Sequence, residues 1–250
     1  IVVEVKNKPP MNMVGHVTSS YYSPNLDKSI AFNKLSVVNL PVNPSKQRTI
    51  FSLIPLLPLY LNKTISPGVI SLLLIDIQKA FLDKDYPGLK RNNLNAEFVC
   101  GEILSKWRIL NLPIIHIRHS SKNKNSKLHP SSKGFEFNDY VKPLKNEIVL
   151  TKKVNSAFIG TNLEKILSDY KLKTLVIIGM TTNHCISSTV RMSGNLGFET
   201  YLVSDSTACF NTKGLDGKII DCNTIYKSAI ASLNEEFATI LNSKKLFEMI

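Results

Sequence analysis

The sequence has few of the features that mark secreted, metal-binding or membrane-spanning chains. Its 250 residues contain four cysteines, Cys100, Cys185, Cys209 and Cys222, which are far apart and form no C-x-x-C pair. This pattern fits neither a disulfide framework nor a zinc knuckle, so we expect a reduced, cytoplasmic protein. No apolar run reaches the roughly 18 residues of a membrane span. The nearest run, residues 49–61, is short and contains two prolines, so we expect no membrane partner. The sequence begins with Ile1 and not with Met, so it leaves open whether a targeting segment precedes it.

Acidic residues are also scarce. The chain has 19 Asp and Glu against 31 Lys and Arg, a net charge of +12, and such a surplus can mark a nucleic-acid-binding protein. The densest basic stretch, residues 120–133, has four lysines but no aromatic side chain on which a base could stack. We therefore interpret it as a solvated loop and expect no nucleic-acid partner.

The prolines are unevenly distributed and divide the chain in two. Eight of the twelve lie between Pro9 and Pro67. Residues 1–66 also lack a sustained helical or strand period. We predict that residues 1–66 form an irregular or partly disordered extension and that residues 67–250 form the folded domain.

Beyond this extension, apolar runs alternate with amphipathic ones. Strands are predicted at residues 69–76, 112–119, 146–152, 173–179, 198–205 and 237–242. Helices are predicted at residues 93–110, 161–172, 183–196 and 221–236. The second helix is expected to begin with a capping box made by Thr161 and Glu164. The alternation predicts a three-layer α/β/α fold, with a Rossmann-like, doubly wound, mostly parallel sheet covered by helices on both faces.

Reactive side chains fall at three predicted strand ends. Asp76 ends the first strand, Lys152 or Lys153 ends the third, and Cys185 follows the fourth where a helix is expected to begin. Each residue type alone is more often a helix cap, a surface charge or a core thiol. In a doubly wound sheet, however, such ends meet at the edge where ligands bind.

The chemistry of these residues is complementary. A helix N-terminus and a nearby lysine both favour a thiolate, so we expect the pKa of Cys185 to lie well below the ordinary value of about 8.5. Asp76 can take up the thiol proton and return it to a leaving amine. Together with backbone N–H groups, these residues would form an acyl-transfer site.

Four stretches together resemble the isochorismatase-like cysteine hydrolases, a family that includes nicotinamidases and N-carbamoylsarcosine amidohydrolases. They are LLLIDIQKAF (72–81), PIIHIRH (113–119), EIVLTKKVNSAFIGTNLEKIL (147–167) and GMTTNHCISSTVRMSGNLGFETYLVSDSTA (179–208). The resemblance spans residues 70–250 and implies a catalytic triad of Asp76, Lys152 and Cys185. The spacing to Phe158 in the family motif favours Lys152 over Lys153.

The resemblance also implies details around the cysteine. It implies a cis peptide bond between Met180 and Thr181. It further implies that the N–H groups of Thr181 and Cys185 form the oxyanion hole, and that the protein assembles as a homo-oligomer.

This sequence departs from the family pattern at the nicotinamidase metal motif. Asp-x-His is missing, and the corresponding stretch reads HIRHSSKNKNSKLH (116–129). We therefore expect no metal, no cofactor and a substrate other than nicotinamide. The candidate pocket walls are Phe81, His119 and Phe158.

The leading interpretation is an amidase-type hydrolase that acts on a C–N bond of a small molecule through an acyl-thioester on Cys185. One alternative is an isochorismatase-type hydrolase of a non-amide bond, although members that cleave a vinyl ether can dispense with the cysteine. The other is a catalytically degenerate binding protein of the same fold. The presence of Asp76, Lys152 and Cys185 together argues against that alternative.

Overall fold

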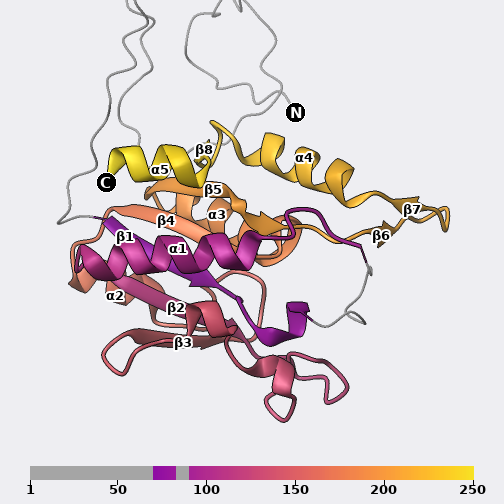
Figure 1. Cartoon of the computed structure of the whole chain (residues 1–250), viewed down its shortest axis with the longest axis horizontal. Coiled ribbons are helices and arrows are strands. Elements are labelled where there is room, and N and C mark those ends of the chain that lie inside the picture. Colours follow the sequence, from indigo (N-terminus) through magenta and orange to yellow (C-terminus); the bar gives the residue numbers. More distant parts are fainter. Residues whose placement is uncertain (1–69, 83–89) are drawn as a thin grey trace, which may run out of the picture. The chain divides into compact units, whose positions relative to one another are not determined.

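The computed structural model describes residues 70–82 and 90–250, and the predicted extension at residues 1–66 lies outside them. A six-stranded sheet in the order β3-β2-β1-β4-β5-β8 forms the centre of the described part (Figure 1). Its strands are β1 (Ile70–Ile75), β2 (Ile114–His119), β3 (Ile148–Lys152), β4 (Thr174–Met180), β5 (Glu199–Ala208) and β8 (Thr239–Leu241). Every neighbouring pair in this sheet is parallel, so the predicted α/β fold is confirmed.

Helices cover both faces of the sheet (Figure 1). They are α1 (Ala96–Ile109), α2 (Leu163–Asp169), α3 (Ser187–Asn195), α4 (Cys222–Leu233) and α5 (Ser243–Met249). On one face, α1 and α5 bury Trp107 and Leu246 against the sheet. On the other face, α2, α3 and α4 contribute Leu163, Val190 and Leu233.

The sequence of strand β1 is almost entirely apolar because the strand is buried on both faces of the sheet. All six of its residues are buried. Because successive side chains of a strand point to opposite faces, Leu72 and Leu74 join the core under α1, while Leu73 and Ile75 join the core under α2 and α3. A strand covered by helices on both faces has no polar side.

Two helices begin differently from the prediction. The expected capping box at Thr161 is wrong: α2 starts at Leu163 with Asn162 as its N-cap residue. The Thr161 Oγ1 hydroxyl instead donates to the Ala157 carbonyl oxygen at 2.6 Å and accepts the N–H of Leu163 at 3.2 Å. The helix expected at residues 183–196 is divided into a π-helical turn, η4 (Thr182–Ile186), followed by α3.

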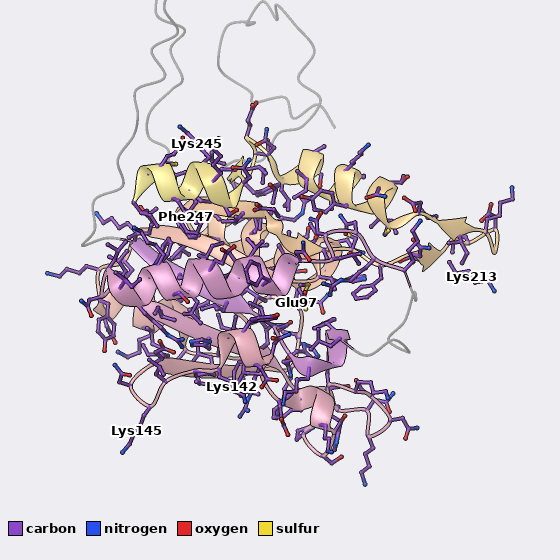
Figure 2. All side chains as sticks on the ribbon, viewed as in Figure 1. Glu97, Lys142, Lys145, Lys213, Lys245 and Phe247 are labelled. Carbon is purple, nitrogen blue, oxygen red and sulfur yellow. The ribbon has the colours of Figure 1, made fainter. Side chains whose placement is uncertain are left out.

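Several elements were not predicted. They are the hairpin strands β6 (Thr212–Lys213) and β7 (Ile219–Ile220), helix α5, and the 3-10 turns η1 (Lys79–Leu82), η2 (Lys133–Phe135) and η3 (Asp139–Val141). The hairpin extends beyond the end of α4 in Figure 1, and Figure 2 shows Lys213 on it, pointing away from the sheet. Within residues 70–82 and 90–250, we find no helix with the length and apolar character needed to cross a membrane.

Candidate active site

Four neighbouring strands each bring one side chain to the carboxyl edge of the sheet. In the sheet order, Lys152 ends β3, His119 ends β2, Asp76 follows β1, and Cys185 follows β4. Lys152 Nζ donates a hydrogen bond to Asp76 Oδ2 at 2.6 Å. A carboxylate oxygen of Asp76, a ring nitrogen of His119 and the Cys185 Sγ all lie within 4.8 Å of one another. The structure therefore brings Asp76, Lys152 and Cys185 together, and it adds His119.

The lysine in this cluster is Lys152. It is fully buried, whereas its neighbour Lys153 is exposed. Besides Asp76, Lys152 Nζ contacts His119 Nδ1 at 3.2 Å and the Val154 carbonyl oxygen at 3.2 Å. A lysine ammonium has three N–H groups, and these three contacts use all of them. Lys152 therefore positions Asp76 and His119, and its positive charge also acts on Cys185.

Asp76 has an unusual backbone and one unoccupied oxygen. Its φ angle of 52° lies in the left-handed region, which Asp tolerates better than most side chains. Oδ2 accepts from Lys152, while Oδ1 is buried with no hydrogen-bond partner among the described residues. Burial raises the pKa of Asp76 above its ordinary value, even though Lys152 acts to lower it. Asp76 is therefore a carboxyl group with a free acceptor oxygen and raised affinity for a proton.

The expectation of a strongly acidic Cys185 thiol is wrong for this arrangement. Burial, followed by the charge of Asp76, raises the pKa of Cys185 to about 12, and Lys152 only partly offsets these effects. Cys185 also lies within the π-helical turn η4 and not at the first turn of an α-helix. Cys185 is therefore a neutral thiol beside a carboxylate, and it becomes a thiolate when Asp76 takes its proton.

The turn that carries Cys185 is fixed by contacts with β1 and β5. Gly179 of β4 pairs with Ile75 of β1, and a Cβ atom at Gly179 would lie 2.0 Å from the Ile75 carbonyl oxygen. The peptide bond between Met180 and Thr181 is cis, as the resemblance implies. Beyond it, the Thr182 and Thr207 hydroxyl oxygens form a buried hydrogen bond of 2.9 Å. These contacts hold the turn against the sheet.

The two phenylalanines proposed as pocket walls are both buried. Phe81 stacks on Phe210, with ring centroids 6.3 Å apart, in a small cluster that includes Met180. Phe158 stacks on Phe198, with centroids 5.9 Å apart, in the core between the sheet and α2 and α3. Phe158 is therefore part of the hydrophobic core, and Phe81 lies nearer to the turn after β4.

Gln78 also contributes to the site, although it was not among the predicted site residues. It is fully buried two residues after Asp76. Its Oε1 accepts the N–H of His119 at 2.8 Å, and its Nε2 donates to the His119 carbonyl oxygen at 3.1 Å. Nε2 also donates to the carbonyl oxygen of Phe135 at 3.0 Å. Gln78 therefore fixes the backbone of His119. The sequence feature that could have indicated this is an amide side chain two residues after Asp76.

The donor atoms of this cluster do not fit a metal ion in the observed arrangement. Asp, His and Cys side chains are ordinary ligands of zinc. Lys152 Nζ, however, lies 2.6 Å from Asp76 Oδ2 and 3.2 Å from His119 Nδ1. The cation of Lys152 already binds two of the three candidate ligands, so a second cation would be repelled.

Comparison with known proteins identifies the family. The isochorismatase domain model matches residues 71–243. The isochorismatase family protein YrdC of Bacillus subtilis is 46% identical over 176 residues, covering 70% of this chain and 93% of its own length. N-carbamoylsarcosine amidase of an Arthrobacter species is 35% identical over 78 residues, 31% of this chain and 30% of that protein. A crystal structure of an isochorismatase-family protein from Chromobacterium violaceum superposes with a TM-score of 0.70 at 36% identity, covering 74% of this chain and 95% of the other. The chain therefore belongs to the isochorismatase family of hydrolases.

Proposed function

We propose that this hydrolase is a cysteine-dependent amidase that cleaves a C–N bond, of amide or carbamoyl type, in a small molecule. The observation that carries the proposal is the position of the Cys185 thiol beside the buried Asp76–Lys152 pair. A soft nucleophile next to a proton acceptor is suited to acyl transfer from nitrogen to sulfur. The similarity to N-carbamoylsarcosine amidase supports the same reaction class.

In the first half-reaction, Asp76 takes the thiol proton as Cys185 Sγ attacks the substrate carbonyl carbon. The carbonyl oxygen becomes an oxyanion, which the N–H groups of Thr181 and Cys185 would stabilise. The protonated Asp76 then delivers its proton to the leaving nitrogen as the C–N bond breaks. An amine departs, and an acyl-thioester remains on Cys185.

In the second half-reaction, Asp76 accepts a proton from water as the water oxygen attacks the thioester carbonyl. The C–S bond breaks, the proton returns to sulfur, and a carboxylic or carbamic acid is released. Lys152 keeps its contact with Asp76 throughout and balances the single negative charge, whether that charge lies on Asp76 or on Cys185. The cycle consumes one water and needs no cofactor.

A substrate screen tests the proposal. Small amides, carbamoyl compounds and lactams are incubated with the native chain, with Cys185→Ala and with Cys222→Ala. The last variant is the matched control, because Cys222 is a buried cysteine at the start of α4. We expect hydrolysis, read as ammonia or amine release or, for a lactam, as ring opening, that falls by about 10³-fold or more in Cys185→Ala and is unchanged in the control. Release that persists in Cys185→Ala at the native rate would contradict the proposed nucleophile.

A further inference from the structure

The second ring nitrogen of His119 is unused in the structure, and the tautomer of the ring is determined by its neighbour. His119 Nδ1 lies 3.2 Å from Lys152 Nζ. An ammonium group can only donate, so Nδ1 must be the unprotonated acceptor and the ring proton must be on Nε2. Burial, and next the charge of Lys152, also lower the pKa of His119, which keeps the ring neutral near pH 7.

The Nε2–H group faces no protein acceptor in the described part of the chain. None of the hydrogen bonds within residues 70–82 and 90–250 involves Nε2, and the ring is only partly buried. A ring nitrogen of the same side chain lies within 4.8 Å of Cys185 Sγ and of an Asp76 carboxylate oxygen. The ring therefore lies beside the proposed nucleophile, and its Nε2–H is a donor with no partner in the described part of the chain.

The position of this donor is fixed from two directions. Lys152, directly opposite His119 in the β2–β3 pairing, holds the ring. Gln78 holds the backbone through the N–H and the carbonyl oxygen of the same residue. A side chain held at both ends loses little further conformational entropy when it binds a ligand.

We propose that His119 is a substrate-binding donor whose Nε2–H binds a second acceptor oxygen, a carbonyl or a carboxylate, adjacent to the scissile carbonyl. This inference rests on the proposed function and narrows its substrate class to amides and carbamoyl compounds that carry such an oxygen. A simple alkyl amide has no second acceptor and leaves the donor unsatisfied, which costs affinity.

The experiment compares two alkylating reagents on Cys185, read by mass spectrometry of the labelled peptide. Iodoacetamide carries a carbonyl group directly bonded to the carbon that reacts, so an acceptor oxygen lies two bonds away, whereas iodomethane has no acceptor. The ratio of their rate constants therefore isolates recognition of the acceptor from changes in the thiol itself. The variants are His119→Asn, whose short amide can accept from Lys152 but does not reach as far as Nε2, and His119→Gln, whose amide N–H₂ can take the place of Nε2–H.

We expect His119→Asn to lower the iodoacetamide rate constant by about ten-fold, the effect of one hydrogen bond, with little change for iodomethane. His119→Gln should restore most of the difference. For a turned-over substrate, His119→Asn should raise KM by a similar factor and leave kcat nearly unchanged.

Two results would overturn the inference: an equal change for both reagents, or no change for either. Failure of the proposed function gives a different result, namely turnover that survives in Cys185→Ala. If Cys185→Ala abolishes turnover while the reagent ratio stays at the native value in both His119 variants, only the role of His119 is wrong. Thermal unfolding of each variant shows whether the fold is retained.

Discussion

At the scale of single residues, two acidic groups share one buried cation. Lys152 supplies one positive charge, and Asp76 and Cys185 can each supply a negative one. Since burial raises the pKa of both Asp76 and Cys185, the site holds one negative charge at a time. Activation of the thiol is therefore a proton transfer to Asp76.

The pH dependence of alkylation tests this description of Cys185. With a thiol pKa of about 12, the iodoacetamide rate should rise about ten-fold per pH unit between about pH 7 and pH 10, because the reactive thiolate is a small fraction throughout. Cys185 should still react before Cys100, Cys209 and Cys222, which are fully buried. A rate plateau near pH 7 would instead indicate a preformed thiolate.

Replacement of Lys152 tests its role as the charge partner. Lys152→Met leaves Asp76 buried without its cation and should lower the free energy of unfolding by about 3–5 kcal/mol. Because Lys152 lowers the pKa of Cys185, the variant should also be alkylated more slowly at a given pH. Lys153→Met is the matched control, since Lys153 is exposed, and both measurements should stay near native values. Equal effects from the two substitutions would refute this assignment.

At the scale of secondary-structure elements, the approach of β4 to β1 depends on Gly179. Its φ of 130° is unfavourable for other residues, and a Cβ atom would meet the Ile75 carbonyl oxygen at 2.0 Å. We predict that Gly179→Ala lowers the free energy of unfolding by about 3 kcal/mol or more. Gly160→Ala is the control: Gly160 also has a positive φ, of 70°, but its Cβ would meet no atom within 4 Å. Gly160→Ala should lower the free energy of unfolding, measured by chemical denaturation, by only about 1 kcal/mol.

An ion cluster at the amino end of β3 joins that strand to α1. Arg108 of α1 binds Glu147 through two hydrogen bonds of 2.8 and 2.9 Å, and His116 Nε2 lies 2.9 Å from the same carboxylate. Burial acts to raise the pKa of Glu147, but the hydrogen bonds from Arg108, the Leu144 N–H and His116 outweigh it and lower the pKa to about 2. The ionised carboxylate is therefore the form that the fold favours.

This depressed pKa predicts a pH-dependent effect of Glu147→Gln. The native carboxylate stabilises the fold above the unfolded-state pKa of about 4.3, and this contribution is lost as the pH falls through the folded value. The variant should therefore be less stable than the native chain by about 2 kcal/mol at pH 6. The deficit should shrink between pH 5 and pH 2 in denaturant titrations. A deficit that does not change with pH would show that packing, and not charge, is responsible.

The sequence alone predicts the elements that are marked by a local pattern of apolar residues. The buried strands β1 and β4 are apolar throughout, and the alternation of Ile148, Leu150 and Lys152 along β3 also indicates which lysine turns inward. The π-helical turn was not predicted: its Thr182 contacts Thr207, 25 residues further along the chain, and a local pattern carries no sign of such a contact. The positions of Asp76, Lys152 and Cys185 followed from strand ends, but the pKa of the thiol depends on burial, which only the packed structure gives.

At the scale of the whole molecule, all the proposed site side chains belong to the part of the chain that the structure describes. Asp76, His119, Lys152 and Cys185 lie within residues 70–82 and 90–250, and residues 1–66 contribute none of them. We therefore predict that deleting residues 1–66 leaves the alkylation rate of Cys185, and any turnover, within about ten-fold of the native value. A truncated chain that keeps its circular-dichroism spectrum but loses labelling would show that the extension shapes the pocket.

The sheet order has a consequence for how the protein is made. Ile70 opens the central strand β1, yet its partner Thr174 in β4 is synthesised 104 residues later. The ribosome therefore releases Asp76, His119 and Lys152 well before Cys185, and β1 lacks one of its two neighbours until then. Such long-range pairing makes folding slow relative to local structure. A nascent or prematurely terminated chain thus carries the acid and the cation without the thiol, so the nucleophile enters the site only when the sheet can close around it.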